Sequence, residues 1–417
     1  MYHSMYSLPQ LSSLFDLEST LLTTVLPIIA MLLINLLFLW HRLSIMPIRF
    51  LRGELKKNKS KRALKLPNFA FIKRFRLRII LSNKGSYALL FLGIFLANFI
   101  LMLGLVLRPS INEYINWIAD NAVADYQYIL KAPATVSNSS AEKFSIRSGE
   151  YYDAPIEQSF DVSLIGIIEH SKYLSNTNFS DDSVLVSESL WEKYKLHDGD
   201  TLEVTDTASN KKYSFKVSGF YPYAAGFAVI MPIEQLNLLV GNDKDYFNGL
   251  FSDVPLNIDQ ELVATVITPD TMRGAGEQML IAFSFMDMVC LLAAVVIHLV
   301  LFVLLTKLVL DKNAHNISLM KIFGYRAGEL RGIFLNTTSI VVMISLILTL
   351  LPVWFGVKLL YVEMMLRKIS GYLEIITPWW CFAITLGLGI CCYFAVNLLL
   401  MRRIRNISMG PALKVKE

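Results

Sequence analysis

The sequence contains none of the short motifs by which enzymes commonly bind a nucleotide or a catalytic metal. No G-x-x-x-x-G-K-[ST] sequence occurs, so the chain has no P-loop of its own, and neither H-E-x-x-H nor G-x-S-x-G is present. Cys/His spacing typical of a zinc site is also missing. We therefore expect a protein that is not an enzyme and that has no catalytic residues, cofactor or metal site.

Cysteine is scarce, and its positions are informative. The chain has only four cysteines, and all lie within apolar stretches: Cys290, Cys381, Cys391 and Cys392. The polar region 108–279 has none, so we expect it to fold without disulfides.

Charge is also sparse, at 18% of residues, while hydrophobic residues make up 54% and the mean hydropathy is +0.48. This balance predicts an integral membrane protein. A helix needs about 20 apolar residues to cross the bilayer. Five stretches reach that length, near 21–40, 87–107, 280–306, 333–360 and 379–401. None resembles a cleaved signal peptide, because the first 20 residues lack a basic segment.

The few charges are strongly segregated along the chain. Residues 42–86 hold fourteen Lys/Arg and one acid, whereas residues 108–279 hold twenty-five Asp/Glu and twelve Lys/Arg. Because basic loops stay in the cytoplasm, we expect the N-terminus, 108–279 and 361–378 outside, with 42–86, 311–332 and the C-terminus inside. This orientation describes a multi-pass protein of the cell (plasma or inner) membrane.

The basic run 42–86 has two readings. It could bind nucleic acid, but its place between two spans favours contact with the lipid bilayer and no nucleic acid. Within it, 53–66 is typical of a flexible linker. Residues 67–84 favour an amphipathic helix lying under the membrane, although Arg76 interrupts its apolar face.

The fold class that follows is an α-helical membrane protein with five transmembrane helices and one mixed α/β domain between the second and third. We divide the chain into 1–52, the first span and its exit; 53–86, the basic linker and interfacial helix; 87–107, the second span; 108–279, the exported domain; 280–401, a three-span core; and 402–417, a basic tail. In the exported domain we expect five strands, at 164–168, 183–186, 201–204, 213–217 and 227–231, with short helices at 187–194 and 233–239. Residues 135–148 are mostly polar and predict a loop.

From Asp270 to Asn313 only two glycines interrupt a helical pattern. A continuous helix of 44 residues would be about 66 Å long, roughly twice the hydrocarbon thickness. We therefore expect the third span to project toward the exported domain.

The turn that follows is unusually apolar for a connection between two spans. It reads NISLMKIFGYRAGELRGIF over 316–334, and Gly324 is expected to end a short helix. One reading is an amphipathic loop on the lipid surface, and the other is a docking surface for a cytoplasmic partner. The residues concerned are Ile317, Leu319, Met320, Lys321, Ile322, Phe323, Gly324, Tyr325 and Arg326.

Two ionisable residues, Asp287 and His298, lie within the third span on nearly one helical face. Intramembrane charge is costly and points by default to a function. The alternative, which we favour, places Asp287 at the outer interface and has His298 bond a neighbouring helix. Asn35, Asn98 and Asn397 are expected to form hydrogen bonds between helices.

In its order of spans and domain, the chain resembles the FtsX-like permease family of ABC transporters, including the MacB-like, lipoprotein-releasing and antimicrobial-peptide-responsive permeases. Three segments carry the likeness: NISLMKIFGYRAGEL (316–330), DSVLVSESLWEKYKLHDGDTLEV with YSFKVSGFYPY (182–223), and NISMGPALKVKE (406–417). The extra first span departs from a four-helix unit. A weak repeat between 34–52 and 396–414 supports the C-terminal half of a two-unit permease.

The resemblance implies a transmembrane subunit that pairs with a second permease unit, as a homo- or hetero-dimer, and with a cytoplasmic ABC ATPase. The turn 311–332 would couple to that ATPase, and ATP hydrolysis would move the exported domain by mechanotransmission. Export or detoxification of peptides or lipid-linked substrates would follow, with a peptide or lipoprotein at the exported domain in a bacterial envelope. The alternatives are an envelope scaffold that activates a cell-wall hydrolase or signals to a sensor kinase rather than transporting, and a membrane sensor with no ATPase.

Overall fold

The computed structural model describes residues 17–43, 76–78, 80–81, 84–133, 141–175, 179, 183–363 and 371–405. The chain divides into two compact units, Met1–Arg74 and Phe75–Glu417. Most of the basic run 42–86, including the greater part of the proposed interfacial helix, and the tail 406–417 lie outside the described residues.

In the first unit, one helical segment comprises α2 (Leu17–Thr20), the π-helical turn η1 (Leu21–Val25) and α3 (Leu26–Leu43). Its apolar side chains are exposed within the unit, among them Leu32 and Ile34. Residues Leu21–Leu37 form a shorter apolar helix than the four candidate membrane spans found among the described residues. Of the five predicted spans, the structure therefore supports four, and the first is the shorter helix.

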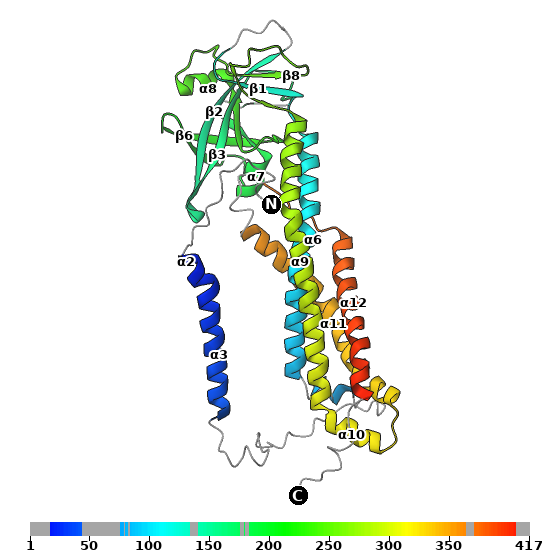
Figure 1. Cartoon of the computed structure of the whole chain (residues 1–417). Helices are drawn as coiled ribbons and strands as arrows, with labels where there is room; N and C mark the ends of the chain where they lie inside the picture. Colours follow the sequence, from blue (N-terminus) through cyan, green and yellow to red (C-terminus); the bar gives the residue numbers. More distant parts are fainter. Residues whose placement is uncertain are drawn as a thin grey trace. The chain divides into compact units, whose positions relative to one another are not determined.

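Those four helices belong to the second unit, where they pack side by side (Figure 1). They are α6 (Lys84–Asp120), α9 (Pro269–Lys312), α11 (Ala327–Tyr361) and α12 (Trp379–Arg405). Each contains an apolar stretch long enough to cross a membrane. Four long apolar helices and one α/β domain fit a membrane protein, as the sequence predicted.

Helices α6 and α9 run antiparallel in close contact, and glycines set their spacing. A Cβ placed at Gly93 would lie 2.4 Å from Leu301, and one at Gly104 would lie 2.8 Å from Cys290 Cβ. A Cβ at Gly276 would lie 2.3 Å from Ile115. Small residues let two helix backbones approach closely. The two helices therefore stay in contact from one end of α6 to the other.

The sheet domain lies in the chain between α6 and α9, and its described residues form nine strands. They are β1 (Tyr126–Leu130), β2 (Glu142–Asp153), β3 (Gln158–Ile167), β4 (Ser183–Ser187), β5 (Thr201–Asp206), β6 (Lys212–Tyr221), β7 (Ala228–Pro232), β8 (Gly249–Ser252) and β9 (Val263–Ile267). Three short helices accompany them: η2 (Ala154–Ile156), α7 (Glu188–Tyr194) and α8 (Ile233–Val240).

The strand order is β3-β7-β4-β6-β5-β2-β8-β1-β9, and β2 also pairs with β3. That pairing closes six strands into a ring around an apolar core that includes Leu164, Val186 and Met231, all fully buried. The ring mixes parallel pairs, β3–β7 and β4–β6, with antiparallel ones. Closure removes two exposed sheet edges, which unpaired strands would otherwise present to solvent.

All five predicted strands and both predicted helices of this domain are confirmed, although β3 begins six residues earlier than predicted, at Gln158, and β6 ends four residues later, at Tyr221. The loop prediction for 135–148 is wrong over its described part, because Glu142–Ser148 belong to β2. Ten residues of β2 pair with β3, and Phe144 fills the core from a largely polar sequence. Cross-strand pairing thus overrode a weak local signal.

An ion pair holds β2 to the turn after β5. Arg147 Nε lies 2.8 Å from Asp206 Oδ1, and its terminal nitrogen donates to Oδ2 over 3.0 Å. The guanidinium and the hydrogen bonds from the Ser209 hydroxyl and the Ala208 amide hold the pKa of this buried carboxyl well below its usual range.

Candidate functional site

The apolar turn between α9 and α11 forms α10 (Ala314–Ile322), and a Schellman motif ends it. The Gly324 amide donates to Lys321 O over 3.0 Å, and the Tyr325 amide donates to Met320 O over 3.1 Å. Gly324 has a φ of +88°, a left-handed conformation that glycine adopts without strain. The predicted role of Gly324 in ending this helix is therefore confirmed.

The predicted docking residues divide into an inner and an outer group. Ile317 is fully buried within the chain, and Leu319, Met320 and Lys321 are half-buried. Ile322 and Phe323 are 44% and 77% exposed, and Tyr325 is 43% exposed. The helix is thus held by Ile317 and presents an apolar end at its C-terminus, which we call the 322–325 face.

The chain turns directly from this face into α11. Arg326 is the N-cap residue of that helix, and its backbone amide donates to Glu329 Oε2 over 2.9 Å. A glutamate at this position is one half of a capping box. The geometry of the 322–325 face is therefore fixed on both sides, by the Schellman motif before it and by the helix cap after it.

Arg76, which interrupted the apolar face of the predicted interfacial helix, has a structural role. Its guanidinium donates to the backbone carbonyl of Gly332 near the start of α11, over 3.0 Å. The basic segment before α6 therefore contacts the element that follows the turn. A sequence pattern limited to one helix contains no signal for such a contact.

The two ionisable residues of α9 face other helices. His298 is fully buried, and its Nδ1 lies 2.8 Å from Ala294 O of its own helix. Its Nε2, without a hydrogen-bond partner among the described residues, lies 3.6 Å from where a Cβ of Gly389 on α12 would be. The expectation that His298 bonds a neighbouring helix is therefore wrong, since the ring bonds its own helix.

Asp287 lies where α9 crosses Gly104 of α6, because a Cβ at Gly104 would be 3.6 Å from Asp287 Cα. One of its carboxylate oxygens is buried without a partner in the described part of the chain. The close glycine contact brings this acid against α6.

Two aromatic-rich segments of the sheet domain, 246–253 and 219–227, contribute side chains to its core. Phe251 from 246–253 is fully buried and stacks on Phe144, with ring centroids 4.2 Å apart. Tyr223 and Phe227 from 219–227 are both buried. Asp200 accepts a hydrogen bond from the His197 amide over 2.8 Å, next to Gly199 at a φ of +92°. That geometry is an ordinary turn.

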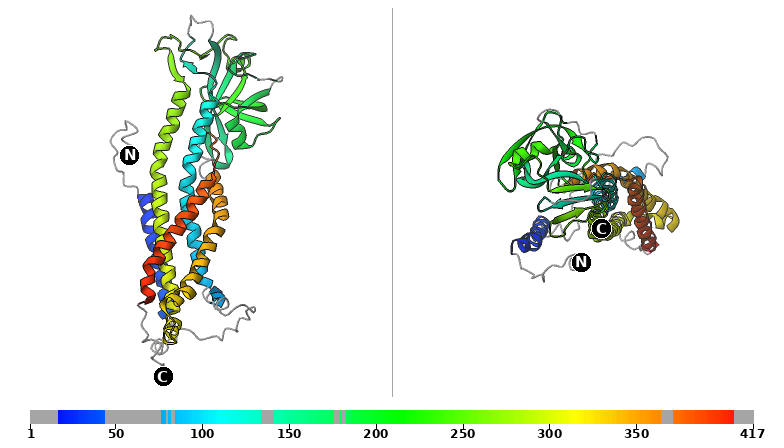
Figure 2. Two further views of the ribbon diagram at one scale, coloured as in Figure 1. Left: turned by 90° about the vertical axis from the view of Figure 1, so that its right-hand side faces the viewer. Right: turned by 90° about the horizontal axis from the view of Figure 1, so that it is seen from above.

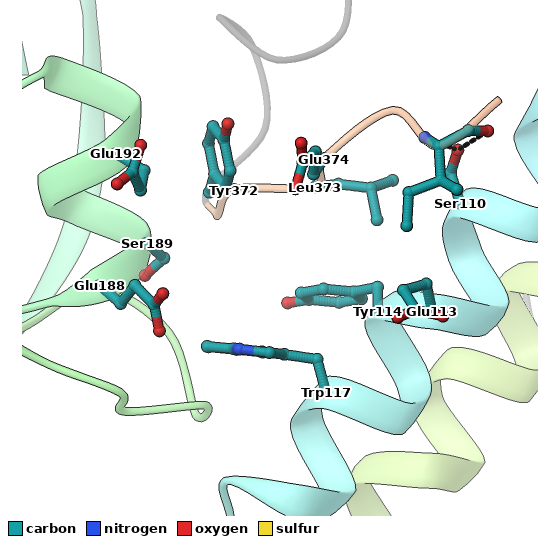
Figure 3. A pocket seen from close by; sticks show the side chains of 11 residues that line it. Ser110, Glu113, Tyr114, Trp117, Glu188, Ser189, Glu192, Tyr372, Leu373 and Glu374 are labelled. Carbon is teal, nitrogen blue, oxygen red and sulfur yellow. Dashed lines mark hydrogen bonds between the residues drawn. The ribbon is translucent and has the colours of Figure 1, made fainter.

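A cavity that motif-based reasoning did not find lies where α6, α7 and the 371–376 segment meet (Figure 3). It has a volume of about 430 Å³. Its walls are Ser110, Glu113, Tyr114 and Trp117 from α6; Glu188, Ser189 and Glu192 from α7; and Tyr372, Leu373, Glu374 and Ile376. These residues come from three distant parts of the sequence, so no local motif marked them.

Hydrogen bonds to two long helices hold the 371–376 side of the cavity. The Ile376 amide donates to Ser110 Oγ over 2.9 Å, and the Tyr361 hydroxyl donates to Leu373 O over 2.7 Å. The cavity is thus bounded by the sheet domain on one side and by fixed elements of the helical bundle on the other.

Comparison with known families identifies one match. Residues 288–409 match the model of the FtsX-like permease C-terminal domain, a range that covers the end of α9, α10, α11 and α12. No curated protein matches the chain. The resemblance drawn from the sequence is confirmed over this range. It indicates a membrane protein with a permease-type role in ABC transport, in a family whose members are transport components that work with an ATPase.

Proposed function

We propose that this chain, similar to FtsX-like permeases over residues 288–409, is a non-catalytic transmembrane subunit that couples a partner ATPase to movement of its sheet domain. The ATPase docks on the 322–325 face in the cytoplasm. Helix α9 then carries the movement to the other side of the membrane. A second permease unit completes the transporter, and its cargo is a peptide or a lipid-linked molecule.

The observation that carries this proposal is the continuity of α9. It is one helix of 44 residues, about 66 Å long, and it is uninterrupted from the sheet domain to the turn before α10 (Figure 2). Strand β9 ends at Ile267 just before it, and α10 begins at Ala314 just after it. A displacement at α10 therefore has a short covalent route to the sheet domain.

Close packing along α6 supports the same route. Antiparallel contacts at Gly93, Gly104 and Gly276 join the two helices that enter and leave the sheet domain. Because these contacts leave little space between the backbones, the pair moves more readily as one body than as two independent helices. This property favours transmission of movement over local bending.

The exposed end of α10 supports the docking step. Large apolar side chains that are exposed together mark interaction surfaces in soluble regions. Phe323 is the most exposed of them, and the basic residues Lys321 and Arg326 flank the face in sequence. An aromatic side chain entering a partner's pocket, with charge at the rim, is a common anchor of protein interfaces.

Co-purification tests the docking step. The full chain is expressed with a candidate ABC ATPase from the same organism, and the variant Ile322→Asp/Phe323→Asp is compared with wild type. We expect loss of the ATPase from the purified complex, because the charged side chains would have to be desolvated in an apolar pocket. Leu238→Asp, at a side chain 73% exposed on α8, is the matched control and should retain the ATPase.

Normal co-purification of the double variant would overturn the docking assignment. Reconstituted complexes then separate transport from the scaffold alternative. Under the transporter proposal, a peptide or lipid substrate changes the rate of ATP hydrolysis. If only a cell-wall hydrolase changes that rate, the transport proposal fails and the scaffold function replaces it.

A further inference from the structure

We propose that the cavity between α6, α7 and 371–376 binds an organic cation with an apolar body. The proposal deepens the proposed function by naming a ligand chemistry for its sheet domain, but the binding itself requires neither ATP nor a partner. It depends on the size of the cavity, its charge and the arrangement of its aromatic rings.

The cavity's volume, about 430 Å³, falls in the range of small-molecule sites. It also accommodates one or two side chains of a larger ligand. The walls come from the sheet domain, from α6 and from the segment before α12, so an occupant contacts three elements at once. Pockets between structural layers are common places for ligand sites.

The charge of the cavity is of one sign. Four of the eleven lining residues, Glu113, Glu188, Glu192 and Glu374, are acidic, and none of the eleven is basic. The pKa of Glu188 is raised, mainly by burial and to a lesser extent by the negative charge of the neighbouring Glu192. Burial, Glu374 and Glu192 raise the pKa of Tyr372. Burial is the larger cause of both shifts, and the neighbouring carboxylates add to it. Four acidic side chains without a basic one among the lining residues favour a cationic ligand.

Aromatic rings give the cavity its apolar surface. Tyr114 and Trp117 lie one helical turn apart on α6 with their rings nearly parallel, 6.3 Å between centroids and 12° between planes. Figure 3 shows them facing Glu188 across the cavity, with Tyr372 opposite Glu192. A cation held over an aromatic face beside carboxylates gains both a cation–π contact and a charge contact. A simple metal ion would contact the carboxylates but not the apolar rings. A neutral apolar molecule would contact the rings but leave the carboxylates without a partner.

Equilibrium dialysis with tetraphenylphosphonium tests the proposal. The full chain is placed in nanodiscs of zwitterionic lipid, and empty nanodiscs measure the probe taken up by lipid alone. We expect saturable binding to the wild-type chain. Glu188→Gln/Glu192→Gln should weaken it at least tenfold. Glu203→Gln/Glu261→Gln removes the same charge from exposed positions of the sheet domain and should change affinity less than twofold.

Two further arms separate charge from shape. Triphenylphosphine oxide, a neutral aromatic probe, should not bind, and Trp117→Leu should weaken tetraphenylphosphonium binding without any change of charge. Near-UV circular dichroism checks that each variant is folded, and Glu113→Gln on α6 provides a second neutralisation independent of the sheet domain.

Displacement of the probe by phenylalanyl-lysine amide would identify a basic peptide as the source of the cation. Lack of displacement would restrict the site to small cations.

Uptake of the probe equal to that of empty nanodiscs would overturn the proposal. Equal affinity for the Glu188→Gln/Glu192→Gln variant would do the same. Because the measurement uses the chain without an ATPase, these failures leave the permease proposal intact. Conversely, loss of the docking assignment at the 322–325 face leaves the binding result intact.

Discussion

The amide of Asn98 on α6 donates a hydrogen bond of 2.9 Å to Thr349 Oγ1 on α11, and both side chains are fully buried. The Thr349 hydroxyl in turn donates to Leu346 O of its own helix over 3.0 Å. This short chain of bonds joins two apolar helices across a part of the bundle where water is excluded. It realises the role that the sequence predicted for Asn98.

A double-mutant cycle measures this bond. Asn98→Ala and Thr349→Val should couple by about 1 kcal/mol, the range found for polar contacts between membrane helices. Unfolding of the purified chain in mixed micelles provides the measurement. Thr337→Val is the control, because the Thr337 hydroxyl bonds Ile333 O of its own helix. Its effect should simply add to that of Asn98→Ala, and coupling equal to that of Thr349 would contradict the assignment.

The α6–α9 contact predicts opposite effects at two nearby glycines. Gly276→Ala should destabilise the fold by about 1–3 kcal/mol, because the new Cβ would meet Cγ1 of Ile115, close to the Ile115 backbone. Gly274→Ala has nothing within 4 Å of its Cβ and should stabilise α9 by about 0.5–1 kcal/mol. Thermal unfolding in nanodiscs compares the two. Ile115→Ala should restore stability to Gly276→Ala, and equal effects of the two substitutions would refute the close contact.

The Arg147–Asp206 pair should stabilise the sheet domain more than the exposed pair Lys172–Asp253. Arg147→Met leaves a buried carboxylate without its partner and should cost about 3 kcal/mol. Asp253→Asn should cost much less, because both side chains of that pair are at least half exposed and solvent screens their charges. Because the folded-state pKa of Asp206 is lowered, its contribution is present above the unfolded pKa of about 3.9 and is lost as pH falls through the folded value. Chemical denaturation at neutral and acidic pH reads out both effects, and equal costs for the two variants would contradict the prediction.

Cysteine labelling tests the orientation of the chain. After replacement of the four native cysteines, Leu238→Cys and Phe323→Cys place thiols at side chains 73% and 77% exposed. The charge distribution predicts that 108–279 lies outside the cell and 311–332 in the cytoplasm. A membrane-impermeant maleimide should therefore label Leu238→Cys in intact cells and Phe323→Cys only in inverted vesicles. Labelling of both from the same side would contradict the predicted orientation.

Prediction from the sequence worked where a local pattern decides the structure. The apolar runs located four long helices, and the pattern after Pro269 predicted 44 helical residues, the length that α9 has. Alternation and turn residues located β3 to β7. These elements are recognisable because each side chain's environment repeats with the period of its own helix or strand.

Prediction failed where partners lie far apart in the chain. No local pattern indicated that β2 pairs with β3 on one side and with β5 and β8 on the other, because its polar residues resemble a loop. The bond from Arg76 to Gly332 crosses 256 positions of sequence, and the cavity joins α6, α7 and 371–376.

The sequence by itself determined which segments are apolar enough to enter a membrane, which segments carry the charges, and that Gly324 terminates α10. Those outcomes follow from hydropathy and backbone preference, which act within a few residues. Only the tertiary structure decided that Ile317 is buried while Phe323 is exposed, and that acids from three segments surround one cavity. Burial and charge proximity depend on which elements pack together, so they become defined only when distant parts of the chain meet.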